Sequence, residues 1–359
     1  MTNKPKVLVM MSGGVDSSVA AYLLKKTGKY NVTGIYIKGY NLDGCADRDI
    51  KDAQSVAFKI GIPFYVWDFE KEYKRRVVDY MINSYKNGLT PNPDVMCNKE
   101  IKFGLFFDKA IKMGADYVAT GHYVKIKKDK NIFYLYQAKD KNKDQSYFLW
   151  TLKQNQLKHC LFPIGNYLKS EVRKIAQKAE LPVAFKKDSQ GICFLGKIKL
   201  ADFLKKKIRP KKGRILNQSG ETIGYHNGAW FYTIGQRHIN AKIKNYQPNS
   251  QPLYVIDKNI KQNTITVSLK NNCPPVKRIF LKNTNIIDPI FENQFKKRPQ
   301  NIWVRFRYRQ PLIKAILIYK KYPEIEFKLP VSFVSLGQSA VFYNNKEKMI
   351  GGGEIIKTS

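Results

Sequence analysis

The amino-terminal part of the chain alternates short apolar runs with amphipathic stretches. The apolar runs at residues 7–11, 32–37, 64–68 and 117–120 are typical of buried strands. Apolar residues recur at helical spacing at residues 16–26, 49–60, 70–85 and 98–113. This alternation predicts an α/β domain, with a Rossmann-like parallel sheet covered by helices on both faces. Ligands of such sheets bind at the carboxyl ends of the strands.

The pattern changes after about residue 203. Residues 203–214 hold seven Lys or Arg in twelve positions and predict a basic linker. Farther along, alternating polar and apolar positions predict strands at residues 279–281, 302–308, 312–319, 325–329 and 340–343. We therefore expect a catalytic domain at residues 1–203, a small β-rich central domain with the basic linker at 204–272, and a C-terminal antiparallel β-barrel at 273–359.

The charge of the chain indicates a polyanionic partner. Lys and Arg number 64 against 28 Asp and Glu, for a net charge of +36, and such an excess neutralises phosphates. A bias of the whole chain toward Lys is the alternative explanation. We find no strongly amphipathic basic helix that would bind a membrane surface. The first apolar run is too short for a signal peptide or a membrane span, so we expect a cytoplasmic protein.

Residues 12–18, Ser-Gly-Gly-Val-Asp-Ser-Ser, follow the first predicted strand and begin the first predicted helix. The two glycines permit backbone conformations that other residues avoid. Backbone N–H groups, serine hydroxyls and the helix N-terminus converge there, which suits a pyrophosphate. The segment is not a Walker-type loop, because no lysine follows at the required position.

Two of the five cysteines lie in segments that suit chemistry. Cys97 follows Asp94 by three residues and stands at the start of a predicted helix, whose dipole would favour the thiolate. Lys99 and Lys102 add positive potential, and Asp94 can take or give a proton. Cys193 lies between Gly191 and Gly196 in a predicted loop. For each cysteine alone, simple packing is the alternative. No C-x-x-C pair is present, which argues against a zinc ribbon.

The phosphate loop resembles that of the PP-loop ATP pyrophosphatases, which cleave ATP to AMP and pyrophosphate. With the two cysteine segments, the chain resembles the tRNA-specific 2-thiouridylase family. Further segments with this resemblance follow in family order at residues 120–123, 143–149, 161–163, 233–237, 307–310, 337–343 and 351–353. The resemblance implies ATP with Mg²⁺, the wobble uridine of tRNAs for Lys, Glu and Gln as target, and a persulfide-donating sulfur-relay protein or cysteine desulfurase as partner.

The resemblance also implies roles for individual residues. ATP would be held by Met10, Met11, Ser12, Gly13, Gly14, Val15, Asp16, Ser17, Ile37 and Gly121. The catalytic residues would be Cys97, Cys193 and Asp94. The tRNA would be contacted by Asn92, Pro93, Asp94, His122, Lys143, Asp144, Gln145, Arg307, Tyr308 and Gln338. The chain departs from the family pattern at Ile37 and in a shortened loop around residues 43–45, where adenine contacts and sulfur-donor docking can differ.

These parts suit one reaction. Adenylation converts a uracil oxygen into a good leaving group, and a persulfide on Cys193 supplies sulfur without free sulfide. Cys97 then attacks the inner sulfur, which leaves a Cys97–Cys193 disulfide; alternatively, Cys97 releases hydrogen sulfide as the attacking species. Because the two cysteines are 96 positions apart, we expect the Cys193 loop to fold over the site and to be mobile without tRNA.

Two other functions remain open. The first is another PP-loop tRNA thiolase, including one with an iron–sulfur cluster on Cys97, Cys193 and Asp94. The second is a non-catalytic RNA-binding relative.

Overall fold

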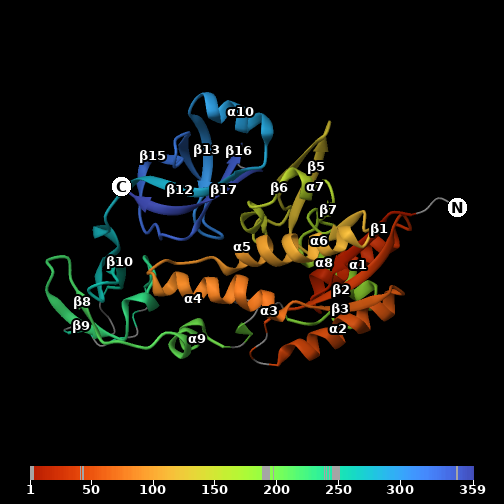
Figure 1. The fold of residues 1–359 in the computed structure, drawn as a ribbon, viewed down its shortest axis with the longest axis horizontal. Helices are drawn as coiled ribbons and strands as arrows, with labels where there is room; N and C mark the ends of the chain where they lie inside the picture. Colours follow the sequence, from red (N-terminus) through yellow and green to blue (C-terminus); the bar gives the residue numbers. More distant parts are fainter. Residues whose placement is uncertain are drawn as a thin grey trace.

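The structure is a computed structural model that describes residues 4–40, 42, 44–187, 195–196, 198–237, 239, 241, 243–244, 251–344 and 347–359. It contains a parallel sheet with flanking helices, a small central sheet and an antiparallel barrel, as the alternation predicted (Figure 1). In Figure 1 the barrel lies at the top, the parallel sheet at the right and the central sheet at the lower left.

The N-terminal sheet has the strand order β3-β2-β1-β4-β7, and its neighbouring strands pair in parallel. Its direction of winding reverses beside β1, because β2 lies on one side of this strand and β4 on the other. Such a reversal opens a crevice at the carboxyl ends of the strands. The strands are β1 (Lys6–Met10), β2 (Asn31–Lys38), β3 (Phe64–Asp68), β4 (Tyr117–Ala119) and β7 (Cys160–Leu161).

Two apolar layers cover the two faces of this sheet. Val7 and Val9 of β1 pack into one core with helices α1, α2 and α8, whereas Met10 packs into the other core with the helices of residues 70–112. Because both faces are buried, the strand is apolar throughout rather than alternating. The helices are α1 (Val15–Lys26), α2 (Cys45–Ile60), α3 (Glu70–Tyr73), α4 (Asp79–Lys86), α5 (Pro93–Cys97), α6 (Phe107–Lys112), α7 (Gln154–Leu157) and α8 (Lys169–Lys178).

Two helical runs of this layer contain wider, π-helical turns. The first runs from α3 through Lys74–Val78 into α4, and the second from α5 through Asn98–Phe106 into α6. The second run begins at Pro93, five residues earlier than the predicted start at residue 98. Proline is favoured at a first helical position because its missing N–H would have no partner there.

The barrel closes on itself because β12 pairs with both β15 and β17. The strands and helix of this part are β12 (Val276–Ile286), α10 (Pro289–Lys297), β13 (Gln300–Arg305), β14 (Ile313–Ile318), β15 (Glu324–Val331), β16 (Ser339–Asn344) and β17 (Lys348–Thr358). A hairpin of the N-terminal part, β5 (Val124–Asp129) and β6 (Ile132–Gln137), extends the barrel sheet at β17. The N-terminal part and the barrel therefore share one sheet.

The central sheet has the order β10-β11-β8-β9 and its own small apolar core. Its strands are β8 (Gly213–Leu216), β9 (Thr222–His226), β10 (Leu253–Asn259) and β11 (Thr264–Leu269). The basic-linker prediction was wrong for its first residues, since helix α9 (Leu200–Lys207) buries Phe203 and Leu204 and exposes three lysines. These two apolar side chains belong to the core that also contains the helices of residues 70–112.

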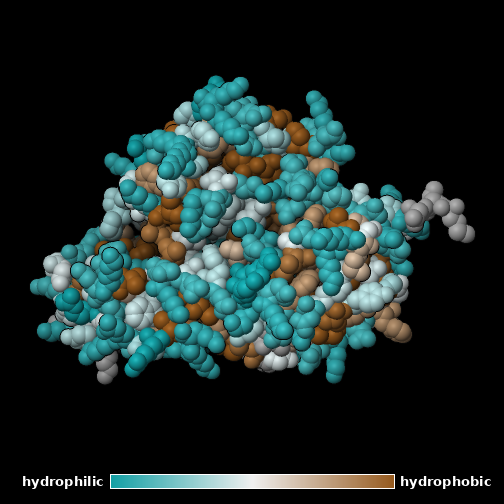
Figure 2. Space-filling model, in the orientation of Figure 1, coloured by the Kyte–Doolittle hydropathy of each residue, from teal (hydrophilic) through white to brown (hydrophobic). Residues whose placement is uncertain are grey.

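The surface agrees with the charge of the chain. Figure 2 shows one face covered mostly by hydrophilic side chains, as expected for a net charge of +36. Among the described residues, no helix is long and apolar enough to cross a membrane.

Candidate functional site

The phosphate loop lies at the carboxyl end of β1, at the reversal point of the sheet. Gly13 has a φ of +70°, and a side chain there would collide with the backbone carbonyl of Asp49 in α2. Gly121, after β4, is equally close, because an added Cβ would lie 2.6 Å from the Ser17 nitrogen. The loop is thus wedged between the loop after β4 and helix α2, where only glycine fits at these two positions.

Hydrogen bonds within the loop fix the shape of its donor surface. The Ser12 N–H donates to the Ser17 Oγ at 3.1 Å, and the Ser18 hydroxyl donates to the Gly14 carbonyl at 2.8 Å. Among the described residues, no side chain caps helix α1, so the first-turn N–H groups remain available to a ligand. This donor set fits the pyrophosphate of ATP, since amides, hydroxyls and a helix N-terminus all favour anions.

Asp16, in the first turn of α1, is held by two donors. Its Oδ1 accepts from the Tyr123 hydroxyl and from the Lys169 ammonium, each at 2.7 Å. Lys169 begins helix α8, and Tyr123 follows β4, so this carboxylate joins three segments around the phosphate loop. A metal would compete with two donors for Oδ1. The described residues contain no group of three His, Cys, Asp or Glu that could hold a metal ion.

Substituting Gly13 tests the phosphate loop directly. Gly13→Ala is expected to weaken ATP binding by at least about tenfold, because the methyl group forces the loop away from Asp49. Gly28→Ala is the matched control, since Gly28 has a φ of +65° but nothing within 4 Å of an added Cβ. Calorimetric titration with ATP measures both variants. Equal affinities of the two variants would contradict the wedged geometry.

Cys97 is buried near Tyr73 and Lys102, at the end of α5. Burial raises the pKa of the Cys97 thiol, whereas the Lys102 ammonium and a hydrogen bond from Tyr73 lower it by smaller amounts. The expectation that a helix dipole would favour the thiolate was wrong. Cys97 is the fifth residue of the helix, and the dipole effect fades beyond the first turn.

Asp94 precedes Cys97 on the same turn. Burial also raises the pKa of the Asp94 carboxyl, and Lys102 opposes this shift. Helix α5 is held at its start by Asn92, whose Oδ1 accepts from the Val95 N–H at 3.2 Å. A carboxyl group with a raised pKa, next to a buried thiol, is suited to exchange a proton with it.

The Cys97 helix packs against the two strand ends that flank β1. On one side, Tyr73, which hydrogen-bonds the Cys97 thiol, lies against Gly39 after β2; an added Cβ would be 2.8 Å from its ring. On the other side, the Phe103 ring lies 6.1 Å from the His122 ring, directly after Gly121. The thiol and the phosphate loop therefore belong to the same edge of the sheet.

The segment before Cys97 joins the barrel and the central domain. The Thr90 N–H donates to the Leu336 carbonyl at 2.8 Å, and the Gln338 side chain donates to the Thr90 carbonyl at 3.1 Å. Arg307 donates to the Ile234 carbonyl of the central domain at 2.9 Å. Asn92, Gln338 and Arg307, far apart in sequence, thus lie around one junction.

Tyr147 connects this junction to Tyr308. The buried Tyr147 hydroxyl donates to the Ser339 carbonyl at 2.9 Å and hydrogen-bonds Asn92. Its ring centre lies 6.2 Å from that of Tyr308, which also packs on Phe148 at 4.5 Å. The structure therefore gathers Asn92, Pro93, Arg307, Tyr308 and Gln338 in one region. Sequence reasoning missed Tyr147 as the residue that connects them, although it lies in the quoted segment 143–149.

Two of the residues predicted to contact tRNA have buried side chains. Asp144 is only 2% exposed, and its carboxylate pairs with Arg305 of the barrel at 2.5 Å. His122 is 7% exposed, and burial lowers the pKa of its imidazole well below the ordinary value, so it carries no charge for a phosphate. Both side chains are held inside the protein, because a buried charge needs an internal partner and a buried imidazole stays neutral; tRNA contact at these two positions stays a prediction.

The remaining predicted residues are distributed as follows. Lys143 and Gln145 are half-buried, and the Gln145 side chain accepts from the Tyr123 N–H at 2.9 Å. Ile37 is half-buried at the end of β2, and the Met11 side chain is buried beside Gly34, so Met11 can offer only its backbone to the loop. Cys193 and Asp43 lie outside the described residues. The predictions for Cys193 therefore stay predictions.

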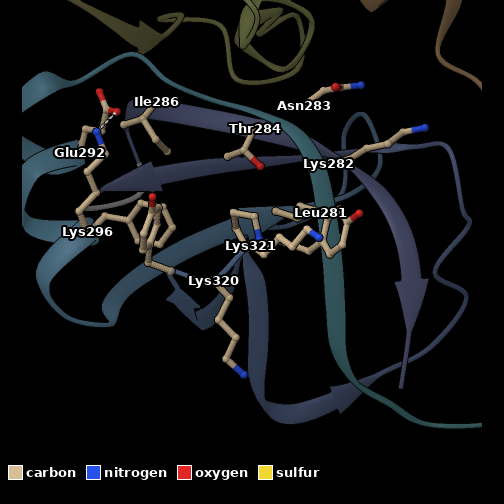
Figure 3. A pocket seen from close by; sticks show the side chains of 13 residues that line it. Leu281, Lys282, Asn283, Thr284, Ile286, Glu292, Lys296, Lys320 and Lys321 are labelled. Atoms are coloured by element: carbon tan, nitrogen blue, oxygen red, sulfur yellow. Dashed lines mark ion pairs between the residues drawn. The ribbon is translucent and has the colours of Figure 1, made fainter.

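A separate groove of about 620 Å³ lies on the barrel, between α10, β12 and the turn at residues 319–323 (Figure 3). Three of its lysines are ion-paired: Lys282 with Glu354, Lys296 with Glu292, and Lys320 with Glu324. Figure 3 shows the Glu292–Lys296 pair at one end of the groove. None of the predicted site residues lines it, so its size does not make it the catalytic site.

Comparison with family models covers most of the chain. The model described as "tRNA methyl transferase HUP domain" matches residues 5–197. The models described as "tRNA methyl transferase PRC-barrel domain" and "Aminomethyltransferase beta-barrel domain" match residues 201–269 and 276–355.

Curated relatives match over nearly their whole length. The chain is 44% identical over 352 residues to "tRNA-specific 2-thiouridylase MnmA 1" of Geobacillus kaustophilus, which covers 95% of this chain and 93% of the relative. Similar proteins named "tRNA-specific 2-thiouridylase MnmA" are 44% identical in Blochmanniella floridana (98% and 96% covered) and 40% identical in Flavobacterium johnsoniae (98% and 99% covered).

Among solved structures, a predicted tRNA methyltransferase subunit from Methanocaldococcus jannaschii is 20% identical, with a TM-score of 0.33 over 48% of this chain and 74% of that one. No inference rests on this weak similarity. The full-length relatives, in contrast, match a span that includes all three parts of the fold. On this evidence the chain belongs to the tRNA-specific 2-thiouridylase family.

Proposed function

We propose that the protein catalyses ATP-dependent 2-thiolation of the wobble uridine of tRNA, as a tRNA-uridine 2-sulfurtransferase. The observation that carries this proposal is the shared sheet edge. The phosphate loop follows β1, while the helix of Asp94 and Cys97 packs at the ends of the neighbouring strands β2 and β4. Full-length similarity to proteins named 2-thiouridylases supports the same reaction.

ATP is a substrate that fits the donor surface of residues 12–18, and the family's chemistry accounts for its use. Cleavage to AMP and pyrophosphate lets the uracil 2-oxygen depart with AMP. The loop's amides and hydroxyls would hold the phosphates, with Gly121 allowing close approach and Ile37 lining the nucleotide. Mg²⁺ would accompany the phosphates, and Asp16 would bind it only in competition with Tyr123 and Lys169.

Sulfur transfer would involve both cysteines. The terminal sulfur of a persulfide on Cys193 forms a bond to C2 of the activated uracil, and AMP leaves. The Cys97 thiolate then attacks the inner sulfur, breaks the S–S bond and releases the thiouridine. The protein is left with a Cys97–Cys193 disulfide. An external thiol must reduce this disulfide before the next turnover. Asp94, three residues before Cys97, would carry the proton that Cys97 loses.

The tRNA would approach the junction of the three domains. Asn92, Pro93 and Asp94 would meet the base, with Lys143, Gln145, Arg307, Tyr308 and Gln338 around them. The wobble base lies in a single-stranded loop, so extracting it costs only about a few kcal/mol of unstacking. A net charge of +36 supplies phosphate attraction. We expect tRNAs for Lys, Glu and Gln as substrates, a persulfide-donating protein as partner, and the cytoplasm as the location.

An assay with radiolabelled sulfur tests this function. The purified protein, ATP, unmodified tRNA for Glu and a persulfide source are expected to give labelled thiouridine with one AMP for each sulfur transferred. Omission of ATP should abolish the label, because the oxygen then has no leaving group. Absence of both AMP and labelled tRNA would refute the proposal. An anaerobic preparation with an iron–sulfur absorption spectrum would favour the cluster-dependent alternative.

A further inference from the structure

Lys186 joins the phosphate loop to helix α2. Its ammonium donates to the Gly13 carbonyl at 3.0 Å, to the Asp49 carboxylate at 2.7 Å and to the Asp52 carboxylate at 2.5 Å. These three acceptors use the three N–H donors that an ammonium has. The side chain nevertheless remains 28% exposed. It is therefore a paired cation on the loop, within reach of solvent.

The backbone at Lys186 is fixed independently of its side chain. The Arg173 guanidinium, from helix α8, donates to the Lys186 carbonyl at 3.2 Å and to the Ala184 carbonyl at 3.4 Å. The backbone of Asp49 also packs closely on the loop, because a Cβ added at Gly13 would collide with the Asp49 carbonyl oxygen. The ammonium is the mobile member of this cluster, since a lysine side chain has four rotatable bonds between fixed backbone and charge.

The cluster has an unbalanced charge. One ammonium faces two carboxylates, so Lys186, Asp49 and Asp52 together carry a net charge of −1 beside a loop built for anions. Burial lowers the pKa of Lys186, but the two carboxylates outweigh this effect and raise it, so the ammonium stays charged. The carboxylates compete with any incoming phosphate for the same cation.

We propose that Lys186 is a phosphate-binding residue of this site, which Asp49 and Asp52 hold until a polyphosphate displaces them. This inference rests on the proposed use of ATP at residues 12–18. A ligand with several charges, such as pyrophosphate or the triphosphate of ATP, competes well with two carboxylates. Orthophosphate, with less charge, competes poorly. The aspartates thus make the loop selective for polyphosphates over single phosphate ions.

Calorimetric titration of the full chain with pyrophosphate and with orthophosphate tests this, without tRNA or sulfur donor. Lys186→Met is expected to weaken pyrophosphate binding by about tenfold, through loss of a charge-assisted contact. Asp52→Asn is expected to tighten it about threefold and to bind orthophosphate better still, because a competing charge is gone. Lys186→Arg should retain most of the affinity. Lys187→Met is the matched control for net charge, because Lys187 is exposed next to it.

The directions in which the two substitutions change pyrophosphate affinity distinguish this role from a structural one. If Lys186 only holds the loop in shape, Lys186→Met and Asp52→Asn should both weaken binding, and that result would overturn the inference. Unchanged binding in Lys186→Met would overturn it too. Thermal unfolding midpoints identify any variant that fails to fold. If Lys186→Met is such a variant, the binding affinities of Lys186→Arg and Asp52→Asn decide the test. Normal pyrophosphate behaviour without any tRNA thiolation would refute the proposed function and leave this inference standing.

Discussion

Replacing Cys97 with serine is expected to reduce release of thiolated tRNA by a factor of about a thousand or more, without preventing AMP formation. The hydroxyl of serine cannot attack the inner sulfur of a persulfide at a useful rate. The terminal sulfur would already be bonded to the base, so the tRNA should remain attached to Cys193 through a disulfide. Non-reducing gel electrophoresis should show this adduct, and dithiothreitol should release thiouridine from it.

Cys273→Ser is the control, because Cys273 is a half-exposed cysteine outside the catalytic segments. Wild-type release by Cys97→Ser without reductant would contradict the proposed role. Loss of product with no adduct would instead support release of hydrogen sulfide by Cys97. The Cys193→Ser protein should form neither product nor adduct, and retained transfer would end the persulfide proposal.

The pH dependence of the release step follows from the same thiol. Because burial raises the pKa of Cys97, its thiolate fraction at neutral pH is below that of a free cysteine. Single-turnover release should therefore accelerate about tenfold per pH unit below that pKa. The Lys102 ammonium lowers the pKa, so Lys102→Met should move the profile to higher pH. A profile independent of pH would show that thiolate formation does not limit release.

Replacing Asp144 with alanine is expected to reduce the free energy of unfolding by about 3–5 kcal/mol, because it leaves the Arg305 charge buried without its partner. Both side chains are nearly inaccessible, at 1% and 7% exposure. The variant also removes the acceptor for the Ser146 hydroxyl and for the Ala138 N–H. Since Asp144 belongs to the N-terminal part and Arg305 to β13, the loss should also loosen the barrel. Denaturant unfolding gives the measurement.

Two companion variants separate packing from RNA contact. Asp144→Asn should cost less than Asp144→Ala, because an amide oxygen still accepts hydrogen bonds. Asp144→Leu combined with Arg305→Met should recover much of the loss, since a buried pair can be replaced by apolar side chains. At a temperature where all are folded, tRNA affinity should be nearly unchanged in Asp144→Asn. A large drop in affinity at unchanged stability would support Asp144 as a tRNA contact.

Local sequence patterns predicted most of the architecture because each depends on neighbours along the chain. The apolar run at residues 7–11 is a strand buried on both faces, and the alternation near residues 302–319 gives paired strands β13 and β14. The glycine at position 13 meets a local requirement of the backbone, because the loop has a φ of +70° there. The resemblance of the quoted segments identified the family, which the full-length relatives confirm.

Burial could not be predicted in this way. Asp144 and Arg305 are 161 positions apart, and only the meeting of β13 with the N-terminal part converts two surface-type residues into an internal pair. The thiol of Cys97 shows the same limit. Its sequence position suggested a helix dipole, but the helix starts earlier at Pro93, and burial dominates the pKa.

The sequence alone indicated the phosphate loop, the order of the three parts of the chain, and Asp94 and Cys97 as neighbouring candidates for chemistry. Only the tertiary structure decided that the hairpin of β5 and β6 extends the barrel sheet and that Lys186 lies on the loop between two aspartates. Backbone preferences and hydrophobic periodicity act over a few residues and are readable directly. Charge pairing and desolvation depend on which distant segments meet, and that is decided by packing of the whole chain.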